Sequence, residues 1–460
     1  MPPLIIGAAP SYVPPLWSTA PFVLLLLAIA VLPLVPACER FWHRNRNKLA
    51  VSLGLSVPVV LYYLLAHPAM AAREAGLPVL GHVLSGTLLE EYLPFILLLF
   101  SLYTISGGIR LTGDLPAHPV TNTIFLAVGA VLASLVGTTG AAMLLIRPLL
   151  GINAERKHVR HTVIFFIFIV CNAGGCLLPT GDPPLFLGYL MGVPFLWTLR
   201  LAAEWATCSA ILLAVYYVWD HAAYRKEAPA DIARDETAVI PLRLRGQINL
   251  VYLAGVILAT ALLVPGQPLL FWPSVAAPEY LREGVMLALV ALSLATTPRG
   301  LREENRFSFG AIGEVAALFV GIFITMQAPI EILRMRGAAL GLTEPWHFFW
   351  ATGLLSSFLD NAPTYAVFLQ TADSLTQGAG PGILALRDGQ FIREDLLAAV
   401  SLGAVLMGAN TYIGNGPNFM VKAIAEERGI RMPSFFGYMA YSVGILVPIF
   451  ALLTLLFFAR

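Results

Sequence analysis

The chain has 460 residues, of which 58% are hydrophobic and only 12% are charged, with a formal net charge of +1. Soluble domains carry about 25% charged residues, so this composition excludes an ordinary soluble protein and indicates an integral protein of the lipid bilayer. The near-neutral balance gives no indication of a nucleic-acid partner. The first charged side chain, Glu39, follows the first apolar run. A signal peptide would place basic residues before that run, so we expect none, which suits a bacterial inner (plasma) membrane.

Residues 1–19 are rich in proline and are expected to be irregular, and long apolar runs follow them. A membrane-spanning helix needs about 20 apolar residues. The candidate spans are 20–38, 49–66, 88–109, 162–192, 196–219, 247–264, 283–297, 309–333, 395–427 and 434–458. Two further apolar segments, 121–150 and 346–371, are interrupted near 137–140 and 359–363. We interpret each as a re-entrant hairpin, two half-length helices that enter and leave on the same side.

The distribution of Lys and Arg supports this arrangement. With the N-terminus outside, basic residues concentrate in the inside loops 39–48, 110–120, 147–161, 220–246, 298–308 and 428–433. The outside loops carry few of them: Arg73, Arg282, Arg334, Arg336, Arg387 and Arg393. This is the positive-inside pattern, and it holds only if the two interrupted segments return to their own side. We therefore expect both termini to lie outside.

The two halves of the chain also align in register. At an offset of 223 residues, Glu91 falls on Glu314, and the hairpin 131–146 overlies 354–369 without a gap. After the longer outside loop 372–394 the offset becomes 233 residues, and glycines and prolines of a second pair of interruptions then coincide. Each half holds five spans and one hairpin. Because five is odd, the second half is inverted in the membrane, which is the inverted-repeat design of secondary transporters.

The predicted fold class is therefore all-α and integral to the membrane. It has two inverted repeats of five transmembrane helices plus one re-entrant hairpin each, with broken helices at the midplane. The segments are an N-terminal segment 1–19, scaffold helices 20–110 and 247–335, transport-domain segments 111–219 and 336–460, and a cytoplasmic linker 220–246.

Polar residues stand just ahead of prolines at three interruptions: Asp182, Asp360 with Asn361, and Asn415. Each is a good helix start, so capping is one interpretation. Capping explains Asn415 well but the aspartates poorly, because a charge at membrane depth costs at least ~2.5–3.5 kcal/mol. In the functional interpretation, the two carboxylates and the carbonyls freed by the breaks bind a hard cation such as Na⁺. Competition of H⁺ and Na⁺ for one carboxylate is the minimal mechanism of antiport.

Further polar residues flank the same interruptions. Thr138 and Thr139 occupy the tip of the first hairpin, where their hydroxyls could bind a cation or cap the second arm. Five others surround the two unwound stretches. Each alone more often satisfies the backbone than binds an ion, but together they favour a polar cavity: Asn172, Thr180, Asn410, Thr411 and Asn418.

Other ionisable side chains have weaker claims to a transport role. Lys422 could carry a proton near the interruption or extend to the inner surface. For Glu91 and Glu314, we expect interfacial or scaffold hydrogen bonds rather than transport roles. The histidines near helix ends could sense pH, but we expect them to be solvated: His158, His161 and His347. No resident cofactor is expected, and Na⁺ and H⁺ enter only as transported ions.

At these interruptions the chain resembles the ion transporter superfamily. Residues 359–363 (LDNAP) look like the second-hairpin signature of its bacterial sodium/proton antiporter branch. Residues 180–184 (TGDPP) and 413–418 (IGNGPN) resemble unwound-helix signatures of that branch and of its citrate transporter branch. The resemblance implies a homodimer with a fixed scaffold and a transport domain that moves like an elevator. The divalent-anion symporters of the superfamily carry Ser-Asn-Thr at the corresponding tips, which differ here.

Two functions follow from these patterns. The first is a sodium/proton antiporter working by alternating access, favoured by two aspartates at the interruptions. The second is a Na⁺- or H⁺-coupled carrier of citrate, another carboxylate or a metal–citrate complex, with helix N-termini at the breaks holding the carboxylates. An enzyme is disfavoured, because the sequence has no HExxH pair and no nucleophile elbow. A channel is disfavoured because paired hairpins in inverted halves suggest alternating access.

Overall fold

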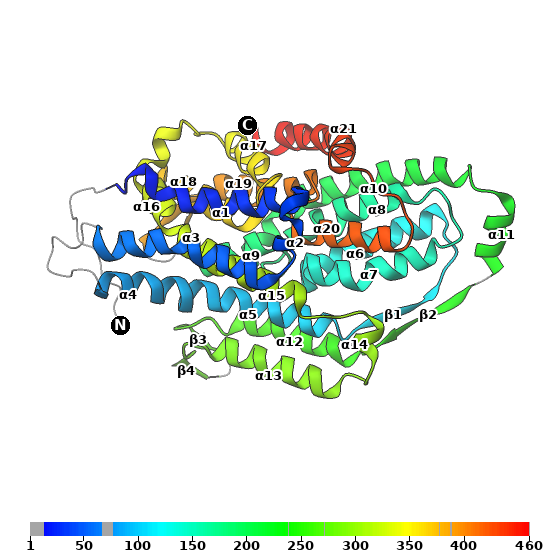
Figure 1. The fold of residues 1–460 in the computed structure, drawn as a ribbon, viewed down its shortest axis with the longest axis horizontal. Helices are drawn as coiled ribbons and strands as arrows, with labels where there is room; N and C mark the ends of the chain where they lie inside the picture. Colours follow the sequence, from blue (N-terminus) through cyan, green and yellow to red (C-terminus); the bar gives the residue numbers. More distant parts are fainter. Residues whose placement is uncertain are drawn as a thin grey trace. The chain divides into compact units, whose positions relative to one another are not determined.

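The computed structural model describes residues 13–66, 77–237, 239–270, 272–376, 378–386 and 389–459. Residues 1–12 of the predicted N-terminal segment lie outside the described residues, as do Arg73 and Arg387 of the predicted outside loops. Helices hold most of the described chain, as the composition predicts (Figure 1). Internal contacts divide the chain into two compact units.

Unit 1 comprises Met1–Ile96, Leu187–Pro194 and Phe309–Ala404. Its first segment contains α1 (Ala20–Val31), α2 (Pro36–Trp42), α3 (Asn45–Leu65), α4 (Leu77–Ser85), the π-helical turn Gly86–Tyr92 and the start of α5 (Leu93–Ser106). Its last segment contains α15 (Gly310–Thr325), α16 (Gln327–Arg336), α17 (Pro345–Ser356), α18 (Asn361–Ser374), β5 (Ile383–Ala385), β6 (Phe391–Arg393) and most of α19 (Glu394–Met407).

Contacts of small and aromatic residues stabilise unit 1. Its helix α3 packs along α15. A Cβ atom added to Gly321 would lie 2.6 Å from the Cβ of Ser52, so only glycine permits this approach of the two backbones. Close contact through small residues is a common means of helix association in membranes. The ring of Phe95 stacks on that of Phe319 with centroids 5.0 Å apart.

Unit 2 comprises Leu97–Phe186, Phe195–Ser308 and Val405–Arg460. Its earlier helices are α6 (Pro119–Val136), α7 (Thr138–Ile152), α8 (Arg160–Ile169), the 3-10 turn Ala173–Cys176, the start of α9 (Pro183–Leu190), α10 (Ala202–Tyr224) and α11 (Pro229–Thr237). Its later helices are α12 (Ile248–Leu262), α13 (Leu281–Thr296), α14 (Leu301–Glu304), α20 (Gly416–Glu427) and α21 (Phe435–Leu453).

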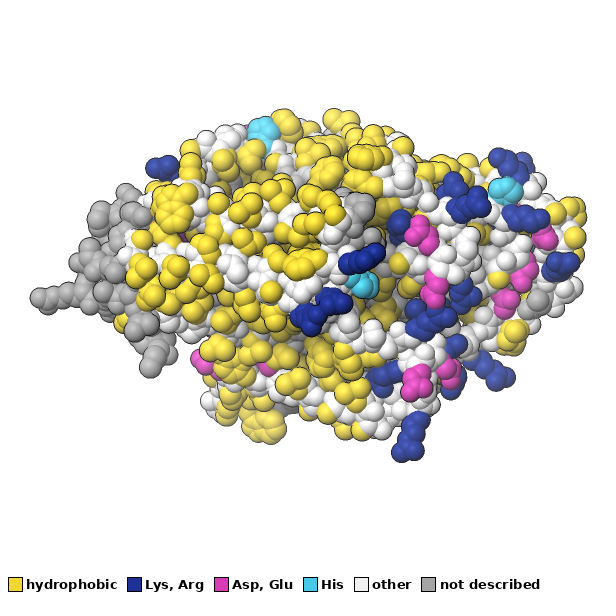
Figure 2. Space-filling view, in the orientation of Figure 1, with side chains coloured by type: hydrophobic (Ala, Val, Ile, Leu, Met, Phe, Trp, Pro, Cys, Tyr) yellow, Lys and Arg dark blue, Asp and Glu magenta, His cyan; other side chains and the backbone are white. Residues whose placement is uncertain are grey.

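Short two-stranded ribbons accompany the helices. In unit 2, β1 (Arg110–Asp114) pairs antiparallel with β2 (Ile240–Arg245), and β3 (Pro268–Leu269) pairs with β4 (Trp272–Ala276). In unit 1, β5 pairs with β6. The predicted linker 220–246 therefore contains both α11 and a strand. Figure 2 shows Lys and Arg side chains gathered over the region of β1, β2 and α11.

Several helices have the length and composition of membrane spans. Five helices within the described residues are long and apolar enough: 45–65, 80–106, 119–136, 195–224 and 435–458. The bent pair Gly310–Thr325 and Gln327–Leu340, with an angle of 43°, would make a sixth. Large apolar side chains such as Leu24, Leu53 and Val57 are exposed on α1 and α3, and Figure 2 shows hydrophobic side chains over this part of unit 1. A lipid environment would cover such a surface.

The helix interruptions lie where the sequence predicts them. One residue, Gly137, separates α6 from α7, and these two helices pack against each other. The chain also leaves the helix between α17 and α18, between α8 and α9, and between α19 and α20. The breaks are thus confirmed, whereas the re-entrant course of the hairpins and the inverted repeat stay predictions. α6 alone has 18 residues, enough for a candidate span.

The hairpin tip depends on a glycine conformation, which gives a stability prediction. Gly137 has φ +85° and ψ +146°, a region that side chains rarely adopt, and replacing it by alanine should cost about 1–3 kcal/mol. Gly151, in the same helix α7, has open space around an added Cβ. Gly151→Ala should be neutral or stabilise by up to about 1 kcal/mol. Melting in detergent measures both variants, and equal shifts would contradict the assigned conformation.

Candidate functional site

Asp182 lies where two broken helices meet in unit 2. Between α8 and α9 the chain contains glycines and prolines that cannot continue a helix, and Asp182 directly precedes Pro183. Its side chain is 1% exposed. A Cβ atom added to Gly175 would lie 2.8 Å from Thr138 Cγ2 and 3.0 Å from the Cβ of Asp182. Glycine at that position therefore lets the loop close around the carboxylate.

The Asp182 carboxylate accepts hydrogen bonds from two other breaks. The hydroxyl of Thr138, the first residue of α7, donates to Asp182 Oδ1 at 2.9 Å. The amide of Asn415, just before α20, donates to the same oxygen at 3.2 Å. The tip of the first hairpin and the starts of α9 and α20 thus meet at one carboxylate, although 233 residues separate Asn415 from Asp182. The sequence predicted all three residues as site candidates, and the structure brings them together.

A network of amides satisfies the carbonyl groups that the breaks release. The Nδ2 atom of Asn172 donates to Ile167 O and to Asn418 Oδ1, both at 2.8 Å. Asn418 in turn donates to Gly408 O at 2.9 Å and to Thr411 O at 3.0 Å. Buried carbonyls need such partners, since lipid offers none. These two amides therefore satisfy the backbone, the alternative that the sequence left open for each of them.

The hydrogen bonds of the Asn415 side chain differ from those that a helix cap would make. It precedes α20, but its side chain makes no cap hydrogen bond. The Nδ2 atom instead donates to Cys171 O at 3.0 Å as well as to Asp182. The expectation that capping explains Asn415 well is therefore wrong, because the α8–α9 break offers its amide a carbonyl and a carboxylate across the junction.

The remaining candidates of unit 2 surround the same junction. The hydroxyl of Thr180 donates to Ser134 O at 3.2 Å. The hydroxyl of Thr411 accepts from the backbone N–H of Gly414 at 3.1 Å, within the α19–α20 break. The backbone oxygen of Asn410 accepts from the hydroxyl of Ser442 at 2.7 Å. Thr139 follows Thr138 on α7 and is half-buried.

Asp360 and Asn361 lie in unit 1, at the break between α17 and α18. Asp360 is the N-cap of α18, and its carboxylate accepts from the backbone N–H of Ala362 at 3.2 Å. The hydroxyl of Thr364 donates to Asp360 O at 3.0 Å. Asn361 is 1% exposed. The capping role of Asp360 is thus present in the fold, and a cation-binding role would have to coexist with it.

Lys422 projects from α20 toward neighbours on its own side of the helix. Its Nζ lies 3.1 Å from Glu426 Oε2 and 5.5 Å from the centroid of the Tyr412 ring. The ion pair with Glu426 lies one turn further from the break than Lys422, whereas the ring of Tyr412 belongs to the α19–α20 break itself.

The scaffold carboxylates of unit 1 have partners. Lys48 Nζ lies 2.5 Å from Glu314 Oε1, so this acid joins α15 to α3. The amide of Gln327 donates to Glu91 Oε2 at 3.4 Å. These contacts agree with the scaffold hydrogen bonds expected for Glu91 and Glu314.

The sequence did not predict a buried ionic network that the structure contains in unit 2. Arg156 contacts both oxygens of Asp220, with Nη2–Oδ1 at 2.6 Å and Nη1–Oδ2 at 3.1 Å. His161 Nε2 lies 2.8 Å from Asp220 Oδ1, and the amide of Asn122 donates to Oδ2 at 3.2 Å. The expectation of a solvated His161 is wrong, because the end of α10 covers it. The available signal was Asn122, an amide within an apolar run.

Comparison with known proteins adds one finding. A family model described as "Putative citrate transport" matches residues 12–458, which is nearly the whole chain. No curated protein matches the sequence. The match agrees with the citrate transporter branch of the ion transporter superfamily, one of the two branches that the interruptions resemble.

Proposed function

The chain belongs to this citrate transport family, and from that premise we propose that it is a secondary transporter that moves citrate or another carboxylate together with Na⁺ or H⁺. Family membership supports a function in transport across the membrane. The proposal includes Na⁺ or H⁺ as the coupling ion, and citrate, another carboxylate or a metal–citrate complex as the transported substrate.

The observation that carries the proposal is the junction at Asp182. A buried carboxylate there faces a hydroxyl and an amide, and α9 and α20 both begin beside it. Helix N-termini carry a positive partial charge that favours carboxylates, while an aspartate oxygen favours a hard cation. The same junction thus offers ligands for a co-transported pair of opposite charge. We assign Na⁺ or H⁺ to Asp182, with Thr138, Thr180 and the neighbouring carbonyls as further oxygen ligands.

Asp360 is the second proposed cation ligand, with Asn361 beside it on α18. Its capping bond uses one acceptor position of a carboxylate that has about four. The proposal includes the elevator movement of the transport domain, the inverted repeats, a homodimer, and a bacterial inner membrane with both termini outside.

Sodium/proton antiport is the second candidate function. The two aspartates at helix breaks favour it, because Na⁺ and H⁺ can compete for one carboxylate without any anionic cargo. Lys422 is then a proposed proton carrier. The carboxylate carrier moves its coupling ion only when a carboxylate is present, whereas the antiporter needs only Na⁺ and H⁺.

Proton flux in proteoliposomes separates the two functions. We expect that sodium citrate, added outside vesicles that contain a pH dye, produces a flux that NaCl at equal Na⁺ concentration does not. Asp360→Asn should keep the helix cap, because asparagine caps as well as aspartate, but lose the negative charge. If Asp360 binds the coupling ion, this variant should lose at least about 90% of the flux, since a bound cation loses its charged partner.

The control is empty vesicles of the same lipid, which report leakage of citrate and of its protonated forms. Flux with NaCl alone would establish antiport and contradict the carboxylate proposal. Full activity of Asp360→Asn would reduce that residue to a cap. A Na⁺-coupled carrier moves citrate without moving protons, so uptake of labelled citrate is measured in the same vesicles. Absence of both proton flux and citrate uptake would refute both functions for the tested ions.

A further inference from the structure

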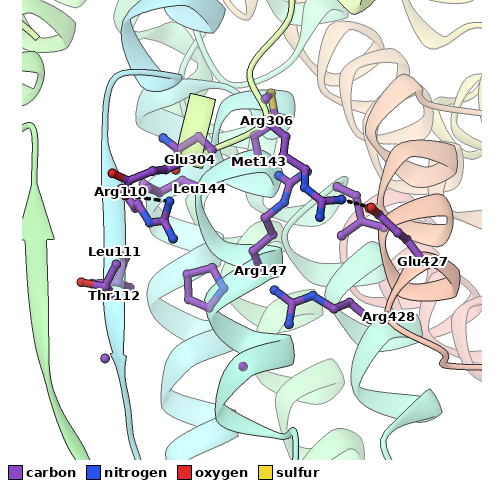
Figure 3. Close-up of a pocket in the computed structure, with 15 residues that line it drawn as sticks. Arg110, Leu111, Thr112, Met143, Leu144, Arg147, Glu304, Arg306, Glu427 and Arg428 are labelled. Atoms are coloured by element: carbon purple, nitrogen blue, oxygen red, sulfur yellow. Dashed lines mark ion pairs between the residues drawn. The ribbon is translucent and has the colours of Figure 1, made fainter. Parts of the chain in front are cut away.

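A cavity of about 470 Å³ lies within unit 2, away from the Asp182 junction. Its wall comes from β1, α7, the turn after α14, and the end of α20. Small-molecule sites span about 300–1,000 Å³, so the size suits one small ligand. Figure 3 shows the side chains of Arg147, Arg306 and Arg428 approaching one another from three separate segments.

The wall is strongly basic. Four arginines and two glutamates line it, which leaves a net formal charge of +2: Arg110, Arg147, Arg306, Arg428, Glu304 and Glu427. The sequence assigned all four arginines to inside loops, which are far apart along the chain. The fold collects them around one space.

Ion pairs account for only some of these charges. Glu304 lies 3.0 Å from Arg110 and 2.7 Å from Arg245, and Glu427 pairs with Arg306. Among the described residues, neither Arg147 nor Arg428 makes an ion pair. Arg147 is half-buried in α7 and feels the like charges of the other three arginines. Such an arrangement is unfavourable without an anion, and guanidinium groups bind carboxylate and phosphate oxygens in pairs.

We propose that this pocket binds a small anion that carries two or three carboxylate or phosphate groups. A single carboxylate can accept the paired hydrogen bonds of one guanidinium group. Because Arg147 and Arg428 approach the cavity from different segments, an anion that binds both needs more than one such group. Arg147 lies nine residues after Thr138 on α7, about 13 Å along the helix axis. The anion would therefore bind at the opposite end of α7 from the Asp182 carboxylate, where the two do not repel each other at close range.

Two helices join the pocket to the Asp182 junction. α7 carries Thr138 at its start and Arg147 near its end, and α20 runs from the Asn415 break to Arg428. α7 and α20 pack against each other. The binding inference does not depend on the proposed transport function, because it concerns equilibrium binding in the absence of a gradient.

Calorimetry on the purified full-length protein in detergent tests the pocket, with citrate, inorganic phosphate and acetate as probes. Citrate should bind more tightly than acetate by about tenfold or more. Arg147→Gln and Arg428→Gln should each weaken citrate binding roughly tenfold or more, since each removes charge-assisted hydrogen bonds. Arg299→Gln, an exposed arginine outside the pocket, is the matched control and should bind as the wild type does. If Arg147→Gln does not fold, the exposed Arg428 at the end of α20 still carries the test.

Unchanged citrate affinity in both pocket variants, or acetate binding as tight as citrate binding, would overturn the inference. Asp182→Asn should leave pocket binding intact, which separates a failure here from a failure of the proposed function. Nanodiscs with and without cardiolipin, whose headgroup carries two phosphates, identify the source of the anion. Competition with citrate would assign the pocket to a lipid headgroup phosphate, and its absence would assign it to a free anion.

Discussion

Asp182→Asn is expected to reduce coupled transport by at least about 100-fold while the protein stays folded. Asparagine has the same size, and its Oδ1 can still accept from Thr138 and Asn415, so the junction of the breaks is preserved. The negative charge is lost. A unit charge pair at 4 Å contributes about 4 kcal/mol at an effective dielectric constant of 20, and about two-thirds of that changes affinity by about 100-fold. Initial uptake rates in proteoliposomes, together with melting in detergent, measure the two effects.

Glu236→Gln is the matched control, because it also removes one negative charge from unit 2 but at the half-exposed surface of α11. It should transport at the wild-type rate. Wild-type transport by Asp182→Asn would show that the carboxylate only organises the loops. Loss of transport accompanied by a large fall in melting temperature would point to the same structural role.

The positions of the breaks follow from local chemistry, which explains why the sequence predicts them. Proline at 183, 363 and 417 cannot donate to a helix, and Gly137 adopts a positive φ that other residues avoid. These constraints act within a few residues, so they can be read without knowledge of the fold. The prediction that Thr138 occupies the hairpin tip relied on the same local signals, whereas its contact with Asp182 comes from the structure.

Long-range partners have no such local signal. Asn415 looks like a helix cap in the sequence, yet its amide reaches Cys171 and Asp182 because two distant breaks face each other. Arg156 looks like one of many basic residues of an inside loop. Its burial against Asp220 depends on how the ends of α6, α8 and α10 pack. The pairing of β1 with β2 across 131 residues is equally a consequence of tertiary structure.

Asp220→Ala is expected to destabilise the protein by about 3–5 kcal/mol, the largest effect on stability that we predict. Asp220 is 0% and Arg156 6% exposed, and the substitution would leave the buried guanidinium with only the longer contact of its Nε to Glu227 Oε1, at 3.8 Å. His161 and Asn122 would lose the same acceptor. Asp395→Ala removes the partner of Arg393 in an exposed pair, and should cost at most about 1 kcal/mol. Melting in detergent compares the two variants.

The double variant Arg156→Met, Asp220→Leu separates an uncompensated charge from lost packing. Replacing a buried ion pair by apolar residues of similar volume is often neutral or stabilising, so the double variant should be more stable than Asp220→Ala alone. Arg156 also donates to Ala117 O at 3.0 Å, and its Nε lies 3.8 Å from Glu227 Oε1. That carbonyl and that buried carboxylate would each lose a partner in the double variant, so recovery should be incomplete. If the double variant were less stable than the single one, Arg156 would contribute through Ala117, Glu227 and the Tyr224 ring rather than through Asp220.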